Sequence, residues 1–342
     1  MPKTAVQRVG PLRHIPRQLA DLGLSSDRIQ ELLGAQREVL NEPDNYLPFA
    51  DAVGLLERCA RETRCPHFGL LIGERADHRD LGIPGSLMAS AATVGQAVLD
   101  FASFQLRNSS AAVVYLAQGE DNTFLGYGIY ERNLGGVFHA YDVAAAVGVN
   151  MLRRLGGPSA RPAELLLSHR GGPDRKPYYR ILGSAVRFDQ PQTALVIPPA
   201  VMELPVLTRD DATHAALTRE IDALIERHYP EFRIRVQHLI RPSLLMGTQS
   251  AKEIARKLGV HVRTLNRRLQ DEGTSFRELS QQVRFSVACE LLEITDLQIS
   301  DVATALSYAT PAAFVHAFQR WSGMAPSEWR AGRHAEAADR DR

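Results

Sequence analysis

The stretch from Ser250 to Gln270 constrains the fold more than any other part of the chain. Its apolar residues recur at helical spacing in two short blocks, and Gly259 stands between them, where a tight turn requires a residue that tolerates positive φ. Ala255, Gly259 and Leu265 have helix-turn-helix spacing: a small residue where the helices touch, a glycine in the turn and an apolar anchor in the second helix.

The exposed positions of this predicted helix pair are strongly basic. Against one acidic residue, Glu253, stand Lys252, Arg256, Lys257, Arg263, Arg267 and Arg268. A helix pair with a purely structural role accounts for the apolar spacing but seldom for such one-sided charge. Because DNA presents a dense row of phosphates, the basic patch predicts a DNA-binding unit.

A long helix is expected to follow this unit. Ser275 and Glu278 have capping-box spacing at the start of a helical pattern that runs from Phe276 to about Ile294. At 1.5 Å per residue, this helix is roughly 28 Å long. Whatever stands at its two ends is therefore separated by nearly one DNA helical repeat, about 34 Å.

A second helix-turn-helix is predicted beyond the long helix. Ser300 is the expected N-cap of a helix over 301–306, a turn follows at 307–309, and Thr310-Pro311 starts a helix over 312–321 with proline at its first position. One chain would then place two recognition helices in successive turns of the major groove.

The outward positions of the two recognition helices are the candidate DNA contacts. Arginine can bond guanine in a bidentate manner, asparagine can bond adenine, and small apolar groups can contact the thymine methyl. We therefore predict base contacts by Arg263, Asn266, Arg267, Ala312, Val315 and His316. Contacts to the DNA backbone, which contribute affinity without sequence information, are predicted for Lys252, Lys257, Thr264, Arg268, Thr310, Gln319 and Arg320. Since the second helix carries little charge, the first is expected to provide most of the specificity.

Composition sets limits on the rest of the protein. The chain has 342 residues, enough for two or three domains, and its net charge is only +1, so DNA affinity must come from a local patch. Its 3 cysteines are a sparse, odd set that fits a reducing compartment. No apolar run approaches the roughly 18–20 residues of a membrane helix, and the N-terminus lacks the apolar core of a signal peptide. We therefore expect a soluble, cytoplasmic protein without membrane association.

The first 205 residues alternate between helical and strand-like patterns. Helices are expected over 16–22, 26–33, 49–62, 68–74, 86–104 and 137–155, and strands over 111–117, 123–130, 164–168, 185–188 and 193–197. The strands do not alternate strictly with helices, so the order predicts an α+β domain.

The chain is thus predicted to have two domains. The α+β domain over 1–205 is followed by a linker over 206–231, which contains a long polar helix at 207–228 that Tyr229-Pro230 would end. The all-α domain, with its two helix-turn-helix motifs joined by the long helix, spans 232–332 and precedes a disordered tail over 333–342.

Aromatic side chains with polar tips suit a ligand pocket that is mostly apolar with a few orienting groups. The α+β domain offers as candidates for such a pocket Phe104, Tyr115, Tyr127, Tyr130, His139, Tyr141 and His169. Each of these residues fits a core or rim position equally well.

Catalytic and metal-binding chemistry lacks supporting motifs. Cys59, Cys65 and His67 fit no common zinc spacing, so the cysteines are interpreted as buried thiols and no metal site is predicted. Neither a nucleophile elbow, a P-loop nor a dinucleotide fingerprint is present, so no cofactor and no enzymatic activity is predicted. Two alternatives stay open: the α+β domain serves only self-association, or it is an enzyme attached to a DNA-binding module.

The paired helix-turn-helix arrangement resembles the AraC/XylS family of bacterial transcription regulators. The resemblance covers 232–330 and rests on the segments 253–284 and 291–330, in which the residues similar to the family signature include Ala303, Phe314, Phe318, Trp321, Gly323 and Pro326. The chain departs from the pattern at Ser307, where glycine is usual, and at Val315 and His316, where small polar and basic residues are usual. The resemblance therefore supports the fold of the second unit more strongly than its base contacts.

Segments 81–98 and 178–206 are similar to the N-terminal domain of the AraC-type subgroup that includes ornithine-responsive and VirS-like regulators. This resemblance implies a domain that senses a small molecule and is not a cupin barrel. It also implies binding to promoter DNA and transcription activation through contact with RNA polymerase. A homodimer is a further expectation. Ligand binding would then change how the linker helix presents the DNA-binding half, with a coupling of roughly 1–3 kcal/mol.

Overall fold

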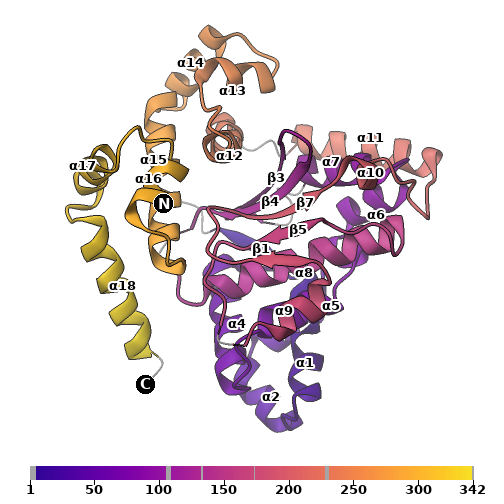
Figure 1. Ribbon diagram of the computed structural model, residues 1–342. Coiled ribbons are helices and arrows are strands. Elements are labelled where there is room, and N and C mark those ends of the chain that lie inside the picture. The colour runs from indigo at the N-terminus through magenta and orange to yellow at the C-terminus, as the bar shows by residue number, and fades with distance from the viewer. Residues whose placement is uncertain (1–4, 105–108, 132–133, 173, 228–230, 341–342) are drawn as a thin grey trace. The chain divides into compact units, whose positions relative to one another are not determined.

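The computed structural model of the protein describes residues 5–104, 109–131, 134–172, 174–227 and 231–340, with the backbone alone at 222–227, 334 and 336–340 (Figure 1). The chain forms two compact units. The first consists of Met1–Leu167, Gly171–Arg187 and Thr193–Arg227, and the second of Ser168–Arg170, Phe188–Gln192 and His228–Arg342. The predicted fold class is confirmed: an α+β unit precedes a helical unit with two helix-turn-helix motifs.

The first unit begins with a small sheet and a set of short helices. Strands β1 (Val6–Arg8) and β2 (Tyr46–Pro48) pair in an antiparallel manner, a sheet that the sequence patterns did not predict. The helical elements up to residue 104 are η1 (Gly10–His14), α1 (Ile15–Asp21), α2 (Ser26–Leu33), α3 (Gln36–Val39), α4 (Phe49–Glu62), α5 (Phe68–Arg75), η2 (His78–Leu81), α6 (Ile83–Ser90) and α7 (Val94–Phe104).

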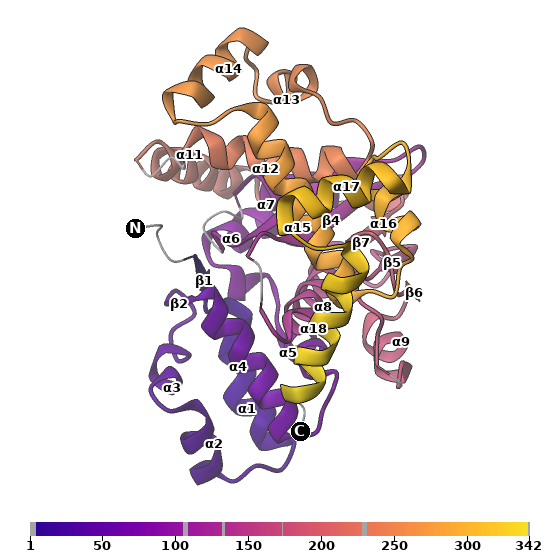
Figure 2. The same cartoon turned by 90° about the vertical axis from the view of Figure 1, so that its left-hand side faces the viewer.

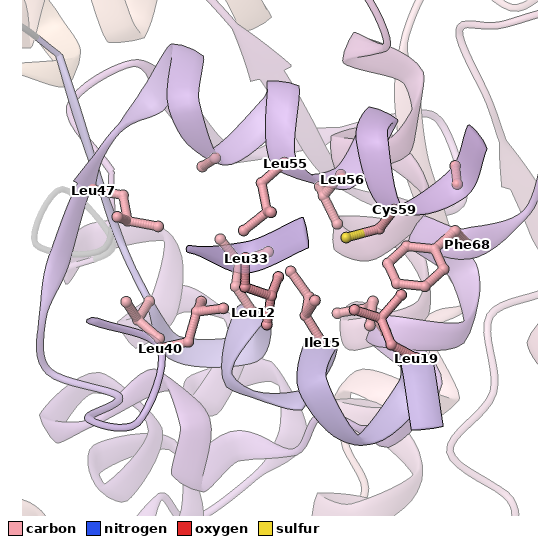
Figure 3. Packing of buried hydrophobic residues seen from close by; sticks show 14 of the residues in the cluster. Leu12, Ile15, Leu19, Leu33, Leu40, Leu47, Leu55, Leu56, Cys59 and Phe68 are labelled. Carbon is pink, nitrogen blue, oxygen red and sulfur yellow. The ribbon is translucent and has the colours of Figure 1, made fainter. Parts of the chain in front are cut away.

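A hydrophobic core joins these helices. Helix α4 turns Leu55, Leu56 and Cys59 toward the aliphatic side chains of η1 and α1, and Phe68 at the start of α5 closes the cluster (Figure 3). These positions recur at helical spacing, which is why one face of α4 is buried. Each large apolar side chain that is fully buried contributes about 1.5–3 kcal/mol.

The main sheet has five strands in the order β3-β4-β7-β5-β6 (Figure 1). Its strands are β3 (Ala112–Gln118), β4 (Thr123–Ile129), β5 (Glu164–Leu166), β6 (Ala185–Arg187) and β7 (Thr193–Ile197). The predicted hairpin of β3 and β4 is present, and β7 pairs in an antiparallel manner with both β4 and β5. All positions of β7 are buried, as expected of a central strand.

Helix α8 (Val137–Gly156) contacts both the sheet and α5. Glycines let α5 and α8 approach closely, because a Cβ at Gly69 would lie 2.3 Å from the carbonyl oxygen of His139. The remaining helices of this unit are α9 (Lys176–Leu182), α10 (Pro199–Met202) and α11 (Asp211–Arg227).

The helix predicted over 86–104 is wrong, because the segment forms two helices, α6 and α7. The break falls at 91–93, where the Thr93 hydroxyl accepts a hydrogen bond from the Gln96 amide at 3.1 Å. A threonine that caps a following helix competes with continuation of the preceding one.

Helix α11 starts later than predicted and belongs to the first unit. The Asp210 carboxylate accepts hydrogen bonds from the amides of Ala212 and Thr213, both at 3.1 Å, and so caps the helix. Ile221 is fully buried, and His214 Nε2 lies 2.8 Å from Asp100 Oδ2 on α7. The end of this helix was predicted at Tyr229-Pro230, which lies outside the described residues.

The second unit is built on a central helix, α15 (Phe276–Ile294), whose boundaries and capping box match the prediction. Its other helices are α12 (Phe232–Leu245), α13 (Ala251–Lys257), α14 (Val262–Asp271), α16 (Ile299–Ala305), α17 (Pro311–Ser322) and α18 (Pro326–Arg340). Both α12 and α17 contact α15 (Figure 2). Arg241 of α12 is fully buried, and its Nη2 lies 2.9 and 2.8 Å from the two carboxylate oxygens of Glu290 on α15.

Helix α18 extends further than predicted. Residues 333–340, expected to be a disordered tail, continue the helix, and 341–342 lie outside the described residues. The segment after Gly332 is rich in alanine and arginine and lacks proline, a composition that favours helix. In the described part of the chain, no helix is both long and apolar enough to cross a membrane.

The buried ion pair between α12 and α15 predicts a large effect on stability. Glu290→Ala removes the carboxylate that balances Arg241 and should lower the free energy of unfolding by about 3–5 kcal/mol. Urea unfolding followed by circular dichroism measures this loss. The control is Glu253→Ala, which breaks the pair with the exposed Arg256 and should cost less than about 1 kcal/mol. Equal losses in the two variants would contradict the prediction.

Candidate DNA interface and ligand cavity

The first helix-turn-helix has the predicted local structure. The Ser250 hydroxyl accepts a hydrogen bond from the Glu253 amide at 3.1 Å and caps α13. Gly259 in the turn has φ +65°, and an added Cβ would meet nothing within 4 Å, so backbone conformation alone favours glycine there. The predicted inward positions are buried: Ile254, Ala255, Leu265 and Leu269.

Three of the predicted base-contacting side chains share one exposed face of α14. Arg263, Asn266 and Arg267 are exposed, whereas Leu265 and Leu269 on the opposite side are buried. Their i, i+3 and i+4 spacing makes them neighbours on the helix surface. The face carries two guanidinium groups and an amide, the kinds of group that can bond the edges of bases.

The residues predicted to contact the DNA backbone differ in their exposure and in their contacts with other residues of the protein. Lys252 is exposed, and Thr264 is half-buried. Lys257 Nζ donates to Ser243 Oγ at 3.1 Å, and the Arg268 guanidinium lies 5.2 Å from the centre of the Phe232 ring. An ammonium group has three donors, so the bond to Ser243 leaves Lys257 able to bond a phosphate as well.

The second helix-turn-helix differs from prediction at its first cap. Helix α16 begins at Ile299 after Gln298, whose amide donates to Asp301 Oδ2 at 3.3 Å, so Ser300 is not the N-cap. An aspartate at the third helical position binds the free amide before the helix more effectively than a serine already inside the first turn.

The second recognition helix, α17, starts as predicted. Thr310 Oγ1 accepts a hydrogen bond from the Ala313 amide at 3.2 Å, and Pro311 is the first helical residue. Val315 is half-buried, and the exposed candidates for DNA contact are Thr310, Ala312, His316, Gln319 and Arg320. Because the Thr310 hydroxyl accepts the bond from the Ala313 amide, it is the N-cap of α17.

An aromatic cluster fastens α17 and α18 to the central helix. The ring of Phe285 on α15 lies 5.5 Å from that of Phe318, 5.7 Å from that of Trp321 and 6.2 Å from that of Trp329. Phe314 and Phe318 are fully buried. Aromatic pairs at such distances contribute about 0.5–1.5 kcal/mol beyond the burial of their area, so the position of α17 on α15 is well determined.

The cysteines are free and buried, as predicted. Burial raises the pKa of Cys59 to about 12 and also raises that of Cys65. Both thiols therefore stay protonated near neutral pH. Among the residues described, no group of three or more His, Cys, Asp or Glu side chains could hold a metal ion.

The first unit contains a cavity of about 120 Å³ between its main sheet and helices α4 and α8. On the sheet side, register places Val114 opposite Tyr127 and Tyr127 opposite Thr193, so these side chains share one face. Leu125 pairs with Leu195 on the same face. The helices contribute to the lining Phe49, Ala52, Val53, Leu56, Ala140, Val143, Ala144, Ala145, Val147, Gly148 and Met151.

Of the predicted pocket residues, Tyr127 lines this cavity and the others do not. Tyr115 and His139 are buried elsewhere. Tyr141 is also buried, and its hydroxyl accepts a hydrogen bond from the Ile129 amide at 3.3 Å. Phe104 and Tyr130 are half-buried, and His169 belongs to a segment of the second unit.

Sequence reasoning missed most of the lining because it searched for aromatic rings with polar tips. The lining is mainly aliphatic, and Ala140, Ala144 and Gly148 of α8 recur every fourth residue, so they lie on one face of the helix. That run of small residues was the available signal, but ordinary close helix packing produces the same spacing.

Comparison with known proteins assigns both units to described families. Residues 23–206 match the family described as the arabinose-binding domain of AraC transcription regulator, N-terminal, and residues 254–332 match a helix-turn-helix domain family. The chain is 28% identical over 293 residues to the HTH-type transcriptional regulator VirS of Mycobacterium tuberculosis, covering 85% of this chain and 86% of VirS.

Two proteins of Pseudomonas aeruginosa are also similar. The ornithine utilization regulator is 26% identical over 318 residues, which cover 91% of this chain and 92% of the regulator. The crystal structure of the transcriptional regulator CdpR aligns with 92% of this chain and 97% of its own, at 25% identity and a TM-score of 0.45.

The turn of the second helix-turn-helix predicts a ranking of stabilities. Ser307 has φ +59°, and its hydroxyl donates to the carbonyl oxygen of Leu244 at 3.2 Å. Ser307→Ala keeps the unfavourable φ and loses the bond, so we expect a loss of about 1 kcal/mol. Ser307→Gly also loses the bond but removes strain of about 1–2 kcal/mol, so it should be the more stable variant in urea unfolding. Equal stability of the two variants would show that the turn holds no strain.

Proposed function

This chain belongs to the AraC family of DNA-binding transcription regulators, and we propose that it responds to a small-molecule effector bound in the cavity of its first unit. The observation that carries the proposal is the cavity itself, because most of its lining lies in residues 23–206, the range that matches the arabinose-binding domain family. Protein interiors are close-packed and leave few unfilled spaces, so a space of this size beside the main sheet supports a ligand-binding role.

The DNA-binding proposal assigns roles to residues on both recognition helices. Arg263, Asn266 and Arg267 read bases, and the weakly charged α17 adds apolar contacts through Ala312 and Val315 together with His316. Contacts to phosphates come from Lys252, Lys257, Thr264, Arg268, Thr310, Gln319 and Arg320. The exposed face of α14 and the position of α17 on α15 support this assignment.

The regulator is further proposed to act in the bacterial cytoplasm as an activator that contacts RNA polymerase, with self-association as a homodimer. The bacterial origin of similar regulators supports the location, because a transcription regulator acts where the chromosome is. Activation and the polymerase contact rest on the family resemblance. The domain boundaries proposed are 1–205, 206–231 and 232–332, with α11, the helix of the middle part, belonging to the first compact unit.

Ligand binding is proposed to be coupled to DNA binding through the two short segments of the second unit, Ser168–Arg170 and Phe188–Gln192. Within that unit, the Arg170 amide donates to the carbonyl oxygen of Ile294 at 3.1 Å, and its Nη2 donates to that of Glu293 at 3.0 Å. Asp189 Oδ1 accepts from the Asp296 amide at 2.9 Å. These bonds satisfy backbone groups between the end of α15 and the start of α16.

The same segments continue directly into strands of the first unit. Gln192 is followed by Thr193, the first residue of β7, which lines the cavity together with Leu195. A ligand that shifts the beginning of β7 would therefore pull on the segment that holds the start of the second helix-turn-helix. Coupling of this kind is worth roughly 1–3 kcal/mol in other proteins.

The function is tested by selection of bound fragments from random genomic DNA with the purified chain. A motif of two blocks about one helical turn apart is the expected result, because α14 and α17 would read successive turns of the major groove. A single block would show that α17 reads no bases. If no fragment is enriched, with or without metabolite extract, the proposal of sequence-specific regulation is wrong. Turnover of a bound metabolite would instead favour an enzyme attached to a DNA-binding module.

Base reading by α14 is tested on the recovered motif. Arg267→Ala should weaken binding by about 1–3 kcal/mol and relax selection at one position, because a bidentate contact to guanine is lost. Lys252→Ala is the matched control for a phosphate contact and should weaken binding equally on all sequences while lowering the salt dependence. Uniform weakening by Arg267→Ala would assign Arg267 to the backbone.

The coupling route is tested by a double-mutant cycle in which Ala144→Leu, which adds volume inside the cavity, stands in for a ligand. Ala144→Leu should change affinity for the recovered motif several-fold, and the change should disappear when Arg170→Ala is added, because the bonds to Glu293 and Asp296 are lost. Arg187→Ala, on an exposed side chain of β6, is the control. Additivity of Ala144→Leu and Arg170→Ala within about 0.5 kcal/mol would rule this route out.

A further inference from the structure

We infer that the cavity takes a small, neutral, largely hydrocarbon molecule with at most one polar end, and not a sugar or an amino acid. The inference rests on the proposed function, in which this cavity is the effector site, and it assigns the chemical class of the effector. It departs from the names of the similar proteins, which point to arabinose and ornithine.

The walls of the cavity are apolar on both sides. The sheet presents Val114, Leu125 and Leu195, and α4 and α8 present aliphatic, small and aromatic hydrocarbon groups. Within the described part of the lining, Arg8 is the one residue with a formal charge, and no carboxylate is present. An ammonium group would therefore enter without a counter-charge, which is strongly unfavourable in an apolar interior.

Arg8 is itself already neutralised. Its side chain is 5% exposed, and its Nε and Nη2 donate to Asp44 Oδ1 at 3.0 and 2.7 Å. Nη1 donates to the carbonyl oxygen of Asp80. Since Asp44 already balances the charge of the guanidinium, a carboxylate ligand would add a second negative charge that no further cation in the described lining balances, so a neutral ligand fits this edge better than an anion.

The polar groups of the lining gather mainly at one edge. Gln7 forms an antiparallel bridge with Ser109, and both line the cavity next to Arg8. This edge can receive a single hydroxyl or carbonyl group of a ligand. The remaining polar side chains, Tyr127 and Thr193, stand opposite each other on the sheet.

Energetics favour a hydrocarbon over a polyol. Each buried CH₂ group contributes about 0.8 kcal/mol, whereas each buried hydroxyl without a partner costs about 1–3 kcal/mol. A sugar has a hydroxyl on nearly every carbon, and few of them could reach the polar edge. The volume of about 120 Å³ is close to that of apolar cavities in other proteins that bind benzene.

Small residues of α8 keep this space open. Ala140 and Ala144 are one turn apart and only half-buried, although most of the residues that surround them in the helix are buried. Since both line the cavity, a larger side chain at either position would occupy the ligand's volume. This feature supplies the variant for the test.

The experiment measures binding to the full chain by saturation-transfer NMR and by thermal unfolding, without DNA. The probes are benzene and cyclohexanol, with hexanoate as the anion, arabinose as the polyol and ornithine as the amino acid. We expect benzene and cyclohexanol to bind and to raise the melting temperature. Ala144→Leu should weaken that binding at least tenfold. Ala215→Leu, the same change at an exposed position of α11, should leave it unaltered.

A second variant controls for misfolding of Ala144→Leu. Val143→Ile adds one methylene to the same wall and should weaken benzene binding less than Ala144→Leu, and both variants should keep the far-ultraviolet circular dichroism of the parent chain. The inference is overturned if arabinose or ornithine binds and loses affinity in Ala144→Leu. It is also overturned if hexanoate binds better than cyclohexanol, or if neither benzene nor cyclohexanol binds.

The DNA readout separates this inference from the proposed function. Affinity for the selected fragments is measured with and without cyclohexanol at a saturating concentration. Binding of cyclohexanol in the cavity with a change in DNA affinity supports both conclusions. Binding in the cavity without any change in DNA affinity supports the assigned ligand class and contradicts the proposed response of the regulator.

Discussion

The packing of two helices on α15 is the constraint on which the DNA-binding unit depends. Helix α12 is held by the buried pair of Arg241 and Glu290, and α17 is held by the aromatic cluster around Phe285, which lies five residues before Glu290 on α15. The two attachments differ in character: an ion pair requires a particular geometry, whereas aromatic rings tolerate small shifts. The 19 residues of α15 separate the first helix-turn-helix from the second along the chain, and the helix has a length that is set by its own hydrogen bonds.

The sequence revealed much more of the second unit than of the first, for a physical reason. Helix-turn-helix signals are local: a capping residue, a glycine in the turn and apolar residues at helical spacing all lie within about twenty residues. The start of α16 was predicted two residues too late because Ser300 is of a common N-cap type, whereas the observed N-cap is Gln298. The boundaries of α15 were found because Ser275 and Glu278 cap each other.

Long-range pairing explains what could not be foreseen. The strands over 185–188 and 193–197 were found, yet nothing local shows that β5 lies between them in the sheet. The division of 86–104 depends on the Thr93 cap and on backbone hydrogen bonds from 92–94 to 204–206, and the cavity depends on which faces of β4, β7 and α8 meet. A pocket made of alanines, leucines and valines has the same composition as a core, so only the three-dimensional arrangement distinguishes it.

The strand order also affects how the protein forms during synthesis. Strands β3 and β4 are close in sequence and can pair as soon as both have left the ribosome, but β7, which covers the other edge of β4, comes more than sixty residues later. Until then, β4 presents an open, largely apolar edge. The nascent first unit therefore passes through a stage prone to association with other chains. The helices of the second unit contact one another across shorter separations in the chain, so this delay is smaller there.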